Sequence, residues 1–133
     1  MGYDFGQGKR TGFGIGGFLI GVLDKKKDVF VTMAKIGTGL TDEEWKTLRA
    51  QSSKLIAQSK PKNYDVDKMM DCDVWIHPKI VVEIRADEIT KSPVHTANFA
   101  LRFPRLERFR QDKSPGEVTT LSEIEKMYKS QSS

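Results

Sequence analysis

Residues 101–115 read LRFPRLERFRQDKSP, and the rest of the chain is best interpreted outward from this stretch. Its basic residues are Arg102, Arg105, Arg108, Arg110 and Lys113, and they are interleaved with Leu101, Phe103, Leu106 and Phe109. Only Glu107 and Asp112 oppose them. The pattern predicts a strand over residues 101–109 with one apolar side, followed by a loop over residues 110–113. Cations this close together repel one another unless an anion such as phosphate lies among them, although runs of charge also occur as solvated faces.

The composition fits one globular domain and favours an anionic partner. The chain has 133 residues, enough for a domain with its own core, and 38% of them are hydrophobic. Its 22 Lys and Arg residues against 18 Asp and Glu residues give a formal net charge of +4. A single cysteine, Cys72, provides no disulfide framework, and the two histidines, His77 and His95, are too far apart to be the close-spaced ligands of a structural zinc site. We therefore predict no metal site.

The chain shows no signal for a membrane. It has no apolar run long enough to cross a bilayer, and its first residues lack the basic and then apolar order of a signal peptide. We therefore expect no membrane partner and an intracellular location, which would be cytoplasmic in a prokaryote or nuclear in a eukaryote.

Local signals predict two helices. A threonine followed three residues later by a glutamate forms a capping box at residues 41–44, and apolar residues then recur at helical spacing. This predicts an amphipathic helix over residues 41–57, with Trp45 as a core anchor. A second capping box at residues 120–123 predicts a C-terminal helix over residues 119–130, which needs a surface to pack on.

The other periodic segments are typical of strands. Residues 18–23 and 29–36, joined by a polar turn, predict an antiparallel hairpin. Residues 79–89 alternate between apolar and charged side chains and predict a third long strand, while residues 74–76 predict a short one. Residues 90–98 are polar and predict a loop.

Glycine is concentrated at the start of the chain, over residues 2–17. Three of these glycines satisfy the spacing G-x-G-x-x-G, but a dinucleotide site needs a helix after them, and a strand-like segment follows here. Glycines that lead into a strand permit a bulge or the sharp bend of a small barrel. The segment also carries Lys9 and Arg10, so it fits either a plain exposed linker or a flexible arm that meets a phosphate backbone.

These elements together predict a mainly β fold. Several short strands, one internal helix, glycine bends and a basic strand are typical of a small Greek-key barrel, and the OB-fold is a barrel of this kind that commonly binds nucleic acid. We therefore predict a single OB-fold domain over residues 1–133, with one internal helix and a C-terminal helix.

The order of motifs resembles the C-terminal domain of ATP-dependent DNA ligases, with the archaeal and eukaryotic replicative types the most similar branch. The segments that match are GQGKRTG at residues 6–12, GGFL at 16–19, KIGTG at 35–39, VVEIRADEITKS at 81–92 and LRFPRLERFRQDKSP at 101–115. The last contains R-x-D-K, called motif VI in this family. Two positions depart from the family pattern: Ala97-Asn98 stands where a glycine is usual, and Leu106 where an aromatic residue is usual.

The resemblance implies part of a larger enzyme. The family's catalytic lysine lies in a K-x-D-G motif of a preceding nucleotidyltransferase domain, and this sequence contains no K-x-D-G. We therefore expect residues 1–12 to be a linker that leads in from that domain, and we do not expect this fragment to seal nicks alone. The implied cofactors of the parent enzyme are ATP and Mg²⁺, with neither expected on this domain alone. The implied partners are nicked double-stranded DNA and the nucleotidyltransferase domain, with a sliding clamp as a further candidate.

The resemblance also implies roles for individual residues. Arg110 and Lys113 would contact the β- and γ-phosphates of ATP, and Asp112 would orient one of them as the third catalytic residue. Arg102 and Phe103 would contact the minor groove near the nick. Further candidates for contact with the DNA are Lys9, Arg10, Arg105 and Arg108.

Three alternatives stay open at this stage. Phe103 could pack inside the barrel rather than contact DNA. The chain could be a stand-alone OB-fold module that binds single strands by aromatic stacking. It could also be a protein-docking domain that presents its last helix to a partner.

Overall fold

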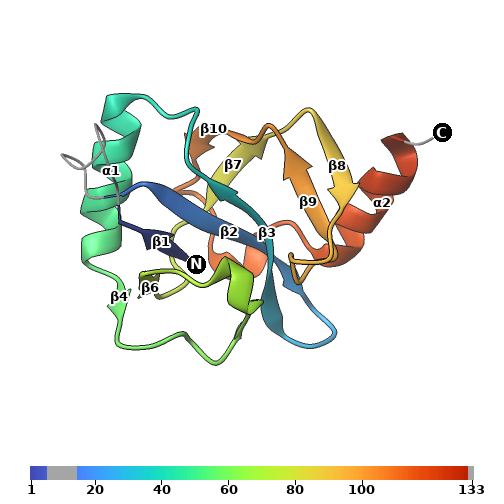
Figure 1. Cartoon of the computed structure of the whole chain (residues 1–133), viewed down its shortest axis with the longest axis horizontal. Coiled ribbons are helices and arrows are strands. Elements are labelled where there is room, and N and C mark those ends of the chain that lie inside the picture. Colours follow the sequence, from blue (N-terminus) through green and yellow to red (C-terminus); the bar gives the residue numbers. More distant parts are fainter. Residues whose placement is uncertain (6–14, 132–133) are drawn as a thin grey trace.

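The fold is built from one large sheet and two short strand pairs that lie across it (Figure 1). The computed structural model describes residues 1–5 and 15–131. The large sheet has the order β4-β6-β1-β2-β3-β5, with β1 Gly2–Asp4, β2 Gly17–Asp24, β3 Val29–Ile36, β4 Ile56–Ala57, β5 Tyr64–Asp65 and β6 Val74–Ile76. The strand pairs are β7 Val82–Arg85 with β10 Arg105–Phe109, and β8 Glu88–Lys91 with β9 Phe99–Arg102.

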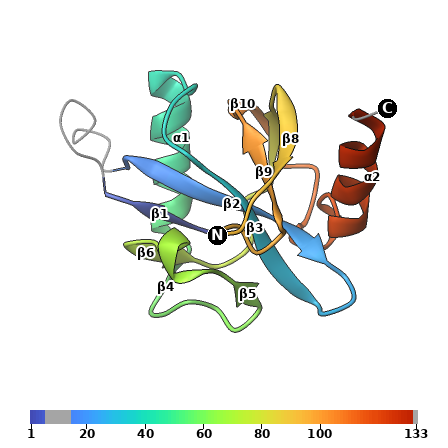
Figure 2. The same ribbon diagram turned by 45° about the vertical axis from the view of Figure 1, so that its right-hand side comes forward.

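Two helices close opposite ends of this β structure (Figures 1 and 2). They are α1 Asp42–Ser53 and α2 Leu121–Gln131, and short 3₁₀ turns occur at Lys68–Met70 and Pro115–Glu117. In Figure 2, β8, β9 and β10 lie above the β2–β3 hairpin while β4, β5 and β6 lie below it. The predicted mainly β class with one internal and one C-terminal helix is confirmed.

The β2–β3 hairpin forms as its sequence predicts. The carboxylate of Asp24 accepts the backbone N–H of Lys26 at 3.1 Å and holds the polar turn between the strands. The register shifts between Ile20 and Gly21, and a Cβ on Gly21 would lie 2.5 Å from the carbonyl oxygen of Val31. Glycine therefore permits the bulge at which the long strands bend across the barrel.

Helix α1 begins at the predicted capping box and ends earlier than predicted. The hydroxyl of Thr41 accepts the N–H of Glu44, and the Glu44 carboxylate accepts the N–H of Thr41. Trp45 is buried and packs edge-on against Phe18, as expected of a core anchor. The helix stops at Ser53, because the last two residues of the predicted range form β4 and pair with β6 instead.

The first strand corrects the predicted linker over residues 1–12. Gly2–Asp4 forms β1, which pairs with β2 on one edge and with β6 on the other, and Tyr3 is buried in the core. A three-residue strand carries too little periodicity to be seen in a glycine-rich sequence. A linker can therefore not begin before Phe5.

The predicted strands over residues 79–89 and 101–109 are each broken in two. The first divides into β7 and β8, and the second into β9 and β10, so that together they form one long, bent hairpin. At the bend, the Asp87 N–H donates to the carbonyl of Arg102 at 2.9 Å. Pro104 cannot donate a ladder hydrogen bond, and Phe103 adopts the left-handed region with φ 52°, so the outer strand cannot continue straight.

A second irregularity lies inside β10, at Glu107. The register shifts between Leu106 and Arg108, so Glu107 is an extra residue opposite β7. Leu106 is buried and Phe109 packs on the core although they are three residues apart, which simple alternation does not allow. The bulge therefore turns two apolar side chains inward and leaves Arg108 on the outer surface.

Helix α2 packs against its own barrel. Its capping box forms as predicted, with the Glu123 N–H donating to the Thr120 hydroxyl. Ile124 is buried in a cluster with Ile89, and Tyr128 packs against Phe99 with ring centroids 5.0 Å apart. Because β8 and β9 cover Ile124 and Tyr128, most of this apolar side packs within the domain, and only Met127 among its described residues stays exposed. This weakens the interpretation of the helix as a docking face for another protein.

The connection from β3 to α1 contains a glycine, Gly39, whose replacement should lower the stability of the domain. Gly39 has φ 87°, and a Cβ there would lie 3.1 Å from the Cβ of Arg105. Gly39→Ala should therefore lower the free energy of unfolding by about 1–2 kcal/mol, through backbone strain and this close contact. Gly116→Ala is the matched control, because a Cβ there meets nothing within 4 Å, and it should change stability by less than about 0.5 kcal/mol. Thermal unfolding of both variants measures the difference, and equal effects would contradict the argument.

Candidate nucleotide and nucleic-acid interface

Arg110 and Asp112 form a two-point ion pair at the end of β10. The Arg110 Nε and Nη2 atoms donate to the two carboxylate oxygens of Asp112 at 3.0 and 2.9 Å. The hydrogen bond from Arg110 lowers the pKa of Asp112 to about 2, and the same bond raises the pKa of Arg110. Both groups are therefore charged at any physiological pH, and the guanidinium has a fixed orientation.

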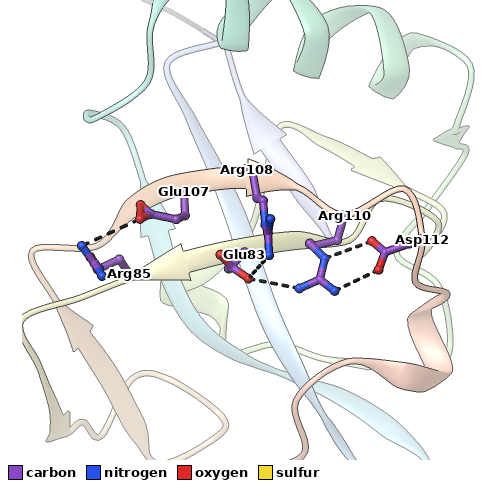
Figure 3. A network of polar contacts seen from close by, with 6 residues as sticks. All are labelled: Glu83, Arg85, Glu107, Arg108, Arg110 and Asp112. Carbon is purple, nitrogen blue, oxygen red and sulfur yellow. Dashed lines mark hydrogen bonds and ion pairs between the residues drawn. The ribbon is translucent and has the colours of Figure 1, made fainter.

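Glu83 on β7 bridges this pair to a second arginine. Its Oε1 atom accepts from Nη1 of Arg110 at 3.0 Å and from Nη2 of Arg108 at 3.3 Å. In Figure 3, dashed lines join Glu83 to both guanidinium groups, and Asp112 lies on the far side of Arg110. The carboxylates thus engage three of the five N–H donors that a guanidinium carries, and Arg110 can still donate to a further oxygen atom.

Lys113 lies one turn beyond Arg110 and is exposed. The backbone N–H of Lys113 donates to the backbone carbonyl of Arg110 at 3.4 Å, and the Lys113 side chain forms no ion pair within the described part of the chain. Both residues line a pocket of about 230 Å³ whose wall also includes Lys79 and Gln51. The sequence offered no signal for Lys79 or Gln51, since they come from a separate loop and from α1. The pocket thus gathers three basic side chains at one opening.

Carboxylates from outside residues 101–115 join Asp112 in pairing with the basic stretch. Every arginine of residues 101–115 has a carboxylate partner. The pairs are Arg102–Glu88 at 2.7 Å, Arg105–Asp87 at 3.0 Å, Arg108–Glu83 at 3.3 Å, and Arg110 with Glu83 at 3.0 Å and Asp112 at 2.9 Å. Three of the four carboxylates come from β7, from β8 and from the turn between them, which the bent hairpin places beside β9 and β10.

This pairing leaves the surface able to bind an anion. Glu83 pairs with two arginines, Arg108 and Arg110, and Lys113 has no carboxylate partner among the described residues. The basic side chains of residues 101–115 therefore outnumber the carboxylates that pair with them, and this surface keeps a net positive charge. The pairs of Arg102, Arg105 and Arg108 are largely exposed, with side-chain exposures of 58% and 42% for Arg102 and Glu88, whereas the Arg110 side chain is 22% exposed. Exposed ion pairs contribute only about 0–1 kcal/mol, so exchanging a carboxylate for a phosphate costs little.

Phe103 stands out from the surface at the bend between β9 and β10. It is 64% exposed, and the guanidinium of Arg102 lies over its ring, 5.3 Å from the centroid. The alternative that Phe103 packs in the barrel core is therefore wrong. An exposed aromatic ring beside an arginine is a suitable contact for sugars or bases.

The remaining predicted DNA contacts differ in position. Arg108 is exposed on the outer face of β10, whereas Arg105 is held at the bend by Asp87 and the carbonyl of Phe103. Lys9 and Arg10 lie outside the described residues, so their predicted contact with the DNA backbone stays a prediction.

The side chains of His95 and Cys72 both have structural surroundings that account for them. His95 is a hydrogen-bonded loop residue, with Nδ1 2.6 Å from the hydroxyl of Ser92. Cys72 is half-buried, and burial raises the pKa of its thiol to about 11, so it is not a reactive thiolate. Among residues 1–5 and 15–131 no group of three or more His, Cys, Asp or Glu could hold a metal ion. No helix of the described chain has the length and apolar character to span a bilayer.

The two departures from the family pattern fit the backbone locally. Asn98 has φ 68°, a conformation that glycine adopts freely and that asparagine tolerates better than most residues. Ala97 before it is fully buried, and Leu106 fills a core position. The loop ahead of β9 thus makes a left-handed turn at an asparagine.

Sequence comparisons agree with these features. The profile described as "ATP dependent DNA ligase C terminal region" matches residues 11–113. A "Probable DNA ligase" from Dictyoglomus turgidum is 48% identical over 98% of this chain and 24% of the relative. A "DNA ligase" from Ignicoccus hospitalis is 40% identical over 98% of this chain and 23% of the relative. The chain thus spans about a quarter of the length of the curated relatives it matches.

A solved structure supports the fold. The ligase domain of LigD from M. tuberculosis superimposes with a TM-score of 0.67, over 88% of this chain and 35% of that one, at 24% sequence identity. This likeness agrees with the predicted OB-fold. With the matched profile covering most of the chain, the protein belongs to the family of C-terminal regions of ATP-dependent DNA ligases.

Proposed function

We propose that this chain is the DNA-binding domain of an ATP-dependent DNA ligase, which supplies motif VI for lysine adenylation and grips nicked duplex DNA. The observation that carries the proposal is the geometry of Arg110, whose guanidinium is fixed by Asp112 and Glu83 yet keeps donors for a phosphate next to Lys113. Fixed cations of this kind suit a reaction in which negative charge develops on a leaving group.

The adenylation step gives these residues distinct roles. When the active-site lysine of the nucleotidyltransferase domain attacks the α-phosphorus of ATP, the bond to the β-phosphate breaks and pyrophosphate leaves. Arg110 and Lys113 would bind the β- and γ-phosphates and stabilise the charge that develops on them. Asp112 would not touch phosphate, because it is an anion, and would instead orient Arg110. ATP and Mg²⁺ would act in the parent enzyme, and we assign no residue of this domain to Mg²⁺.

The DNA-binding steps would use a different part of the same hairpin. Phe103 and Arg102 would both contact the minor groove beside the nick. Phe103 would lean into the groove, since apolar wedges open it at modest cost, and Arg102 would reach the phosphates that line it. Arg108, Lys9 and Arg10 would add backbone contacts that carry no sequence preference. Such contacts suit an enzyme that must act on any nick.

The two sets of residues require two partners. Arg110 and Lys113 would face the nucleotidyltransferase domain of the parent enzyme during adenylation, and Phe103 would face DNA afterwards. This domain would therefore turn relative to its partner domain between the steps. A sliding clamp stays a candidate partner of the parent enzyme, and the location we propose is intracellular.

A single-strand-binding module is the second candidate function. It would bind bases by stacking on a row of exposed aromatic rings. Among the described residues the exposed large aromatic side chains are Phe103 and Phe5. Phe103 lies between β9 and β10, whereas Phe5 follows β1, so the two rings do not form a row. The structure therefore favours the first candidate.

A binding titration separates the two candidates. The full-length protein that carries this domain should bind a nicked duplex more tightly than an intact duplex or a single strand of equal length. Arg102→Gln should reduce the magnitude of the slope of log K against log salt by about one, because one phosphate contact is lost. Fluorescence anisotropy at several salt concentrations measures both quantities. Preference for the single strand would support the second candidate.

A further inference from the structure

Phe103 is held in a conformation that its own sequence does not favour. It has φ 52°, in the left-handed region that bulky residues rarely adopt, and 64% of its surface is exposed. Neither backbone preference nor burial of the ring explains this arrangement. Neighbouring groups must therefore hold the bend, and such strained positions cluster at functional sites.

Arg105 contacts the bend directly. Its Nη1 atom donates to the carbonyl oxygen of Phe103 at 2.9 Å and to a carboxylate oxygen of Asp87 at 3.0 Å. One nitrogen atom thus joins the strained residue to the turn between β7 and β8. An arginine engaged in this way is poorly placed to act as an independent phosphate contact.

Asp87 holds the other side of the same residue. Its backbone N–H donates to the carbonyl of Arg102 at 2.9 Å, just before Phe103, while its side chain pairs with Arg105 just after Pro104. Asp87 therefore ties both flanks of the bend to the turn between β7 and β8. Loss of the side chain would release one flank and leave the backbone contact in place.

The connection after β3 supports the bend from a third direction. Gly39 approaches so closely that a Cβ on it would lie 3.1 Å from the Cβ of Arg105 and 3.8 Å from the carbonyl oxygen of Pro104. Gly39 thus limits where Arg105 and Pro104 can move. Two segments that are distant in sequence, around Gly39 and Asp87, thus meet the bend that carries the exposed phenylalanine.

We propose that Arg105 and Asp87 are positioning residues that hold Phe103 in its outward conformation for DNA, with Gly39 supporting them. The proposal rests on the proposed contact of Phe103 with nicked DNA. It replaces the expectation that Arg105 binds a phosphate itself. It also means that the Asp87 carboxylate would favour DNA binding, although its charge has the same sign as that of DNA.

The direction in which Asp87→Asn changes DNA binding distinguishes Arg105 as a positioning residue from Arg105 as a phosphate contact. Asp87→Asn removes a negative charge, so electrostatics alone would tighten DNA binding. If Asp87 positions Phe103, the same variant should instead weaken binding of nicked duplex about fivefold, as should Arg105→Gln. Glu107→Gln is the matched control, since it removes one negative charge from the same hairpin and its carboxylate pairs with Arg85 at 3.8 Å rather than with Arg105. Glu107→Gln should leave binding unchanged or slightly tighter.

The experiment uses the full-length protein, with anisotropy titrations of nicked duplex and a parallel assay of self-adenylation. In a Phe103→Ala background, Asp87→Asn and Arg105→Gln should cause no further loss of binding, because nothing is left to position. Tighter or unchanged binding by Asp87→Asn would overturn the proposal and restore Arg105 as a phosphate contact. An equal loss of self-adenylation would also overturn it, since the residues would then be merely structural. If Phe103→Ala alone leaves binding unchanged, the proposed DNA contact itself fails and the inference falls with it.

Discussion

Replacing Arg110 with alanine in the full-length protein should slow self-adenylation by roughly 10³-fold or more, the size of the effect of one arginine in related phosphoryl transfers. Sealing of a nick that already carries adenylate should fall much less. The reason is that pyrophosphate leaves only in the first step, and Arg110 with Lys113 would stabilise the charge on that leaving group. Single-turnover assays with labelled ATP and with a pre-adenylated nick measure the two steps separately.

The fold should survive this substitution. The Arg110 side chain is only 22% exposed, but its partners Glu83 and Asp112 are 37% and 65% exposed, so the ion pairs still reach solvent, where such pairs add little stability. Arg85→Ala is the matched control, because it removes an exposed arginine paired to Glu107 on the neighbouring strand. It should leave both steps near the unmodified rate. Equal losses in adenylation and in sealing of the pre-adenylated nick by Arg110→Ala would count against motif VI acting on pyrophosphate.

Phe103→Ala should affect DNA binding and sealing more than self-adenylation, the reverse of the result expected for Arg110→Ala. It should weaken binding of nicked duplex and slow sealing of a pre-adenylated nick by about 10-fold or more, in the range of losing one stacking or wedge contact. Self-adenylation should stay near the unmodified rate, because Phe103 lies away from the Arg110 pocket. Anisotropy on nicked duplex and single-turnover sealing report the change.

The matched control for this variant is Phe5→Ala. Phe5 is also an exposed ring, 59% accessible, but it follows β1 and packs edge-on against Tyr3 rather than beside the basic strands. It should leave DNA binding unchanged. Since Phe103 is exposed, its truncation should not unfold the domain, and a variant that loses its structure would contradict the description of the bend.

Elements with local signals could be predicted from the sequence. The capping boxes at Thr41 and Thr120 each depend on two side chains three residues apart, and both form. The β2–β3 hairpin likewise depends on alternation and a polar turn between adjacent segments. In these cases neighbours in sequence are also the partners in space.

Features set by register between distant strands could not be predicted. The carboxylates that pair with the basic stretch come from Glu83, Asp87 and Glu88, and only the bent hairpin brings them opposite the arginines. The bulge at Glu107 similarly depends on which residue faces Ile84. The residue types of the candidate site were therefore visible in the sequence, while the network that orients them was not.

The proline at 104 was visible but its consequence was not. A proline inside an alternating run weakens a strand, yet nothing in the run shows that the residue before it turns left-handed. That conformation depends on contacts with Arg105 and Asp87, which the chain makes only once folded.

The short first strand has a consequence for how the chain is made. Gly2 pairs with Leu19 on one edge and with Trp75 on the other. As the polypeptide leaves the ribosome, β1 can find its first neighbour early but must wait for more than half of the domain before the second arrives. Contacts of such long sequence separation slow folding, so the centre of the sheet is completed late and its open edge is exposed to other nascent chains in the meantime.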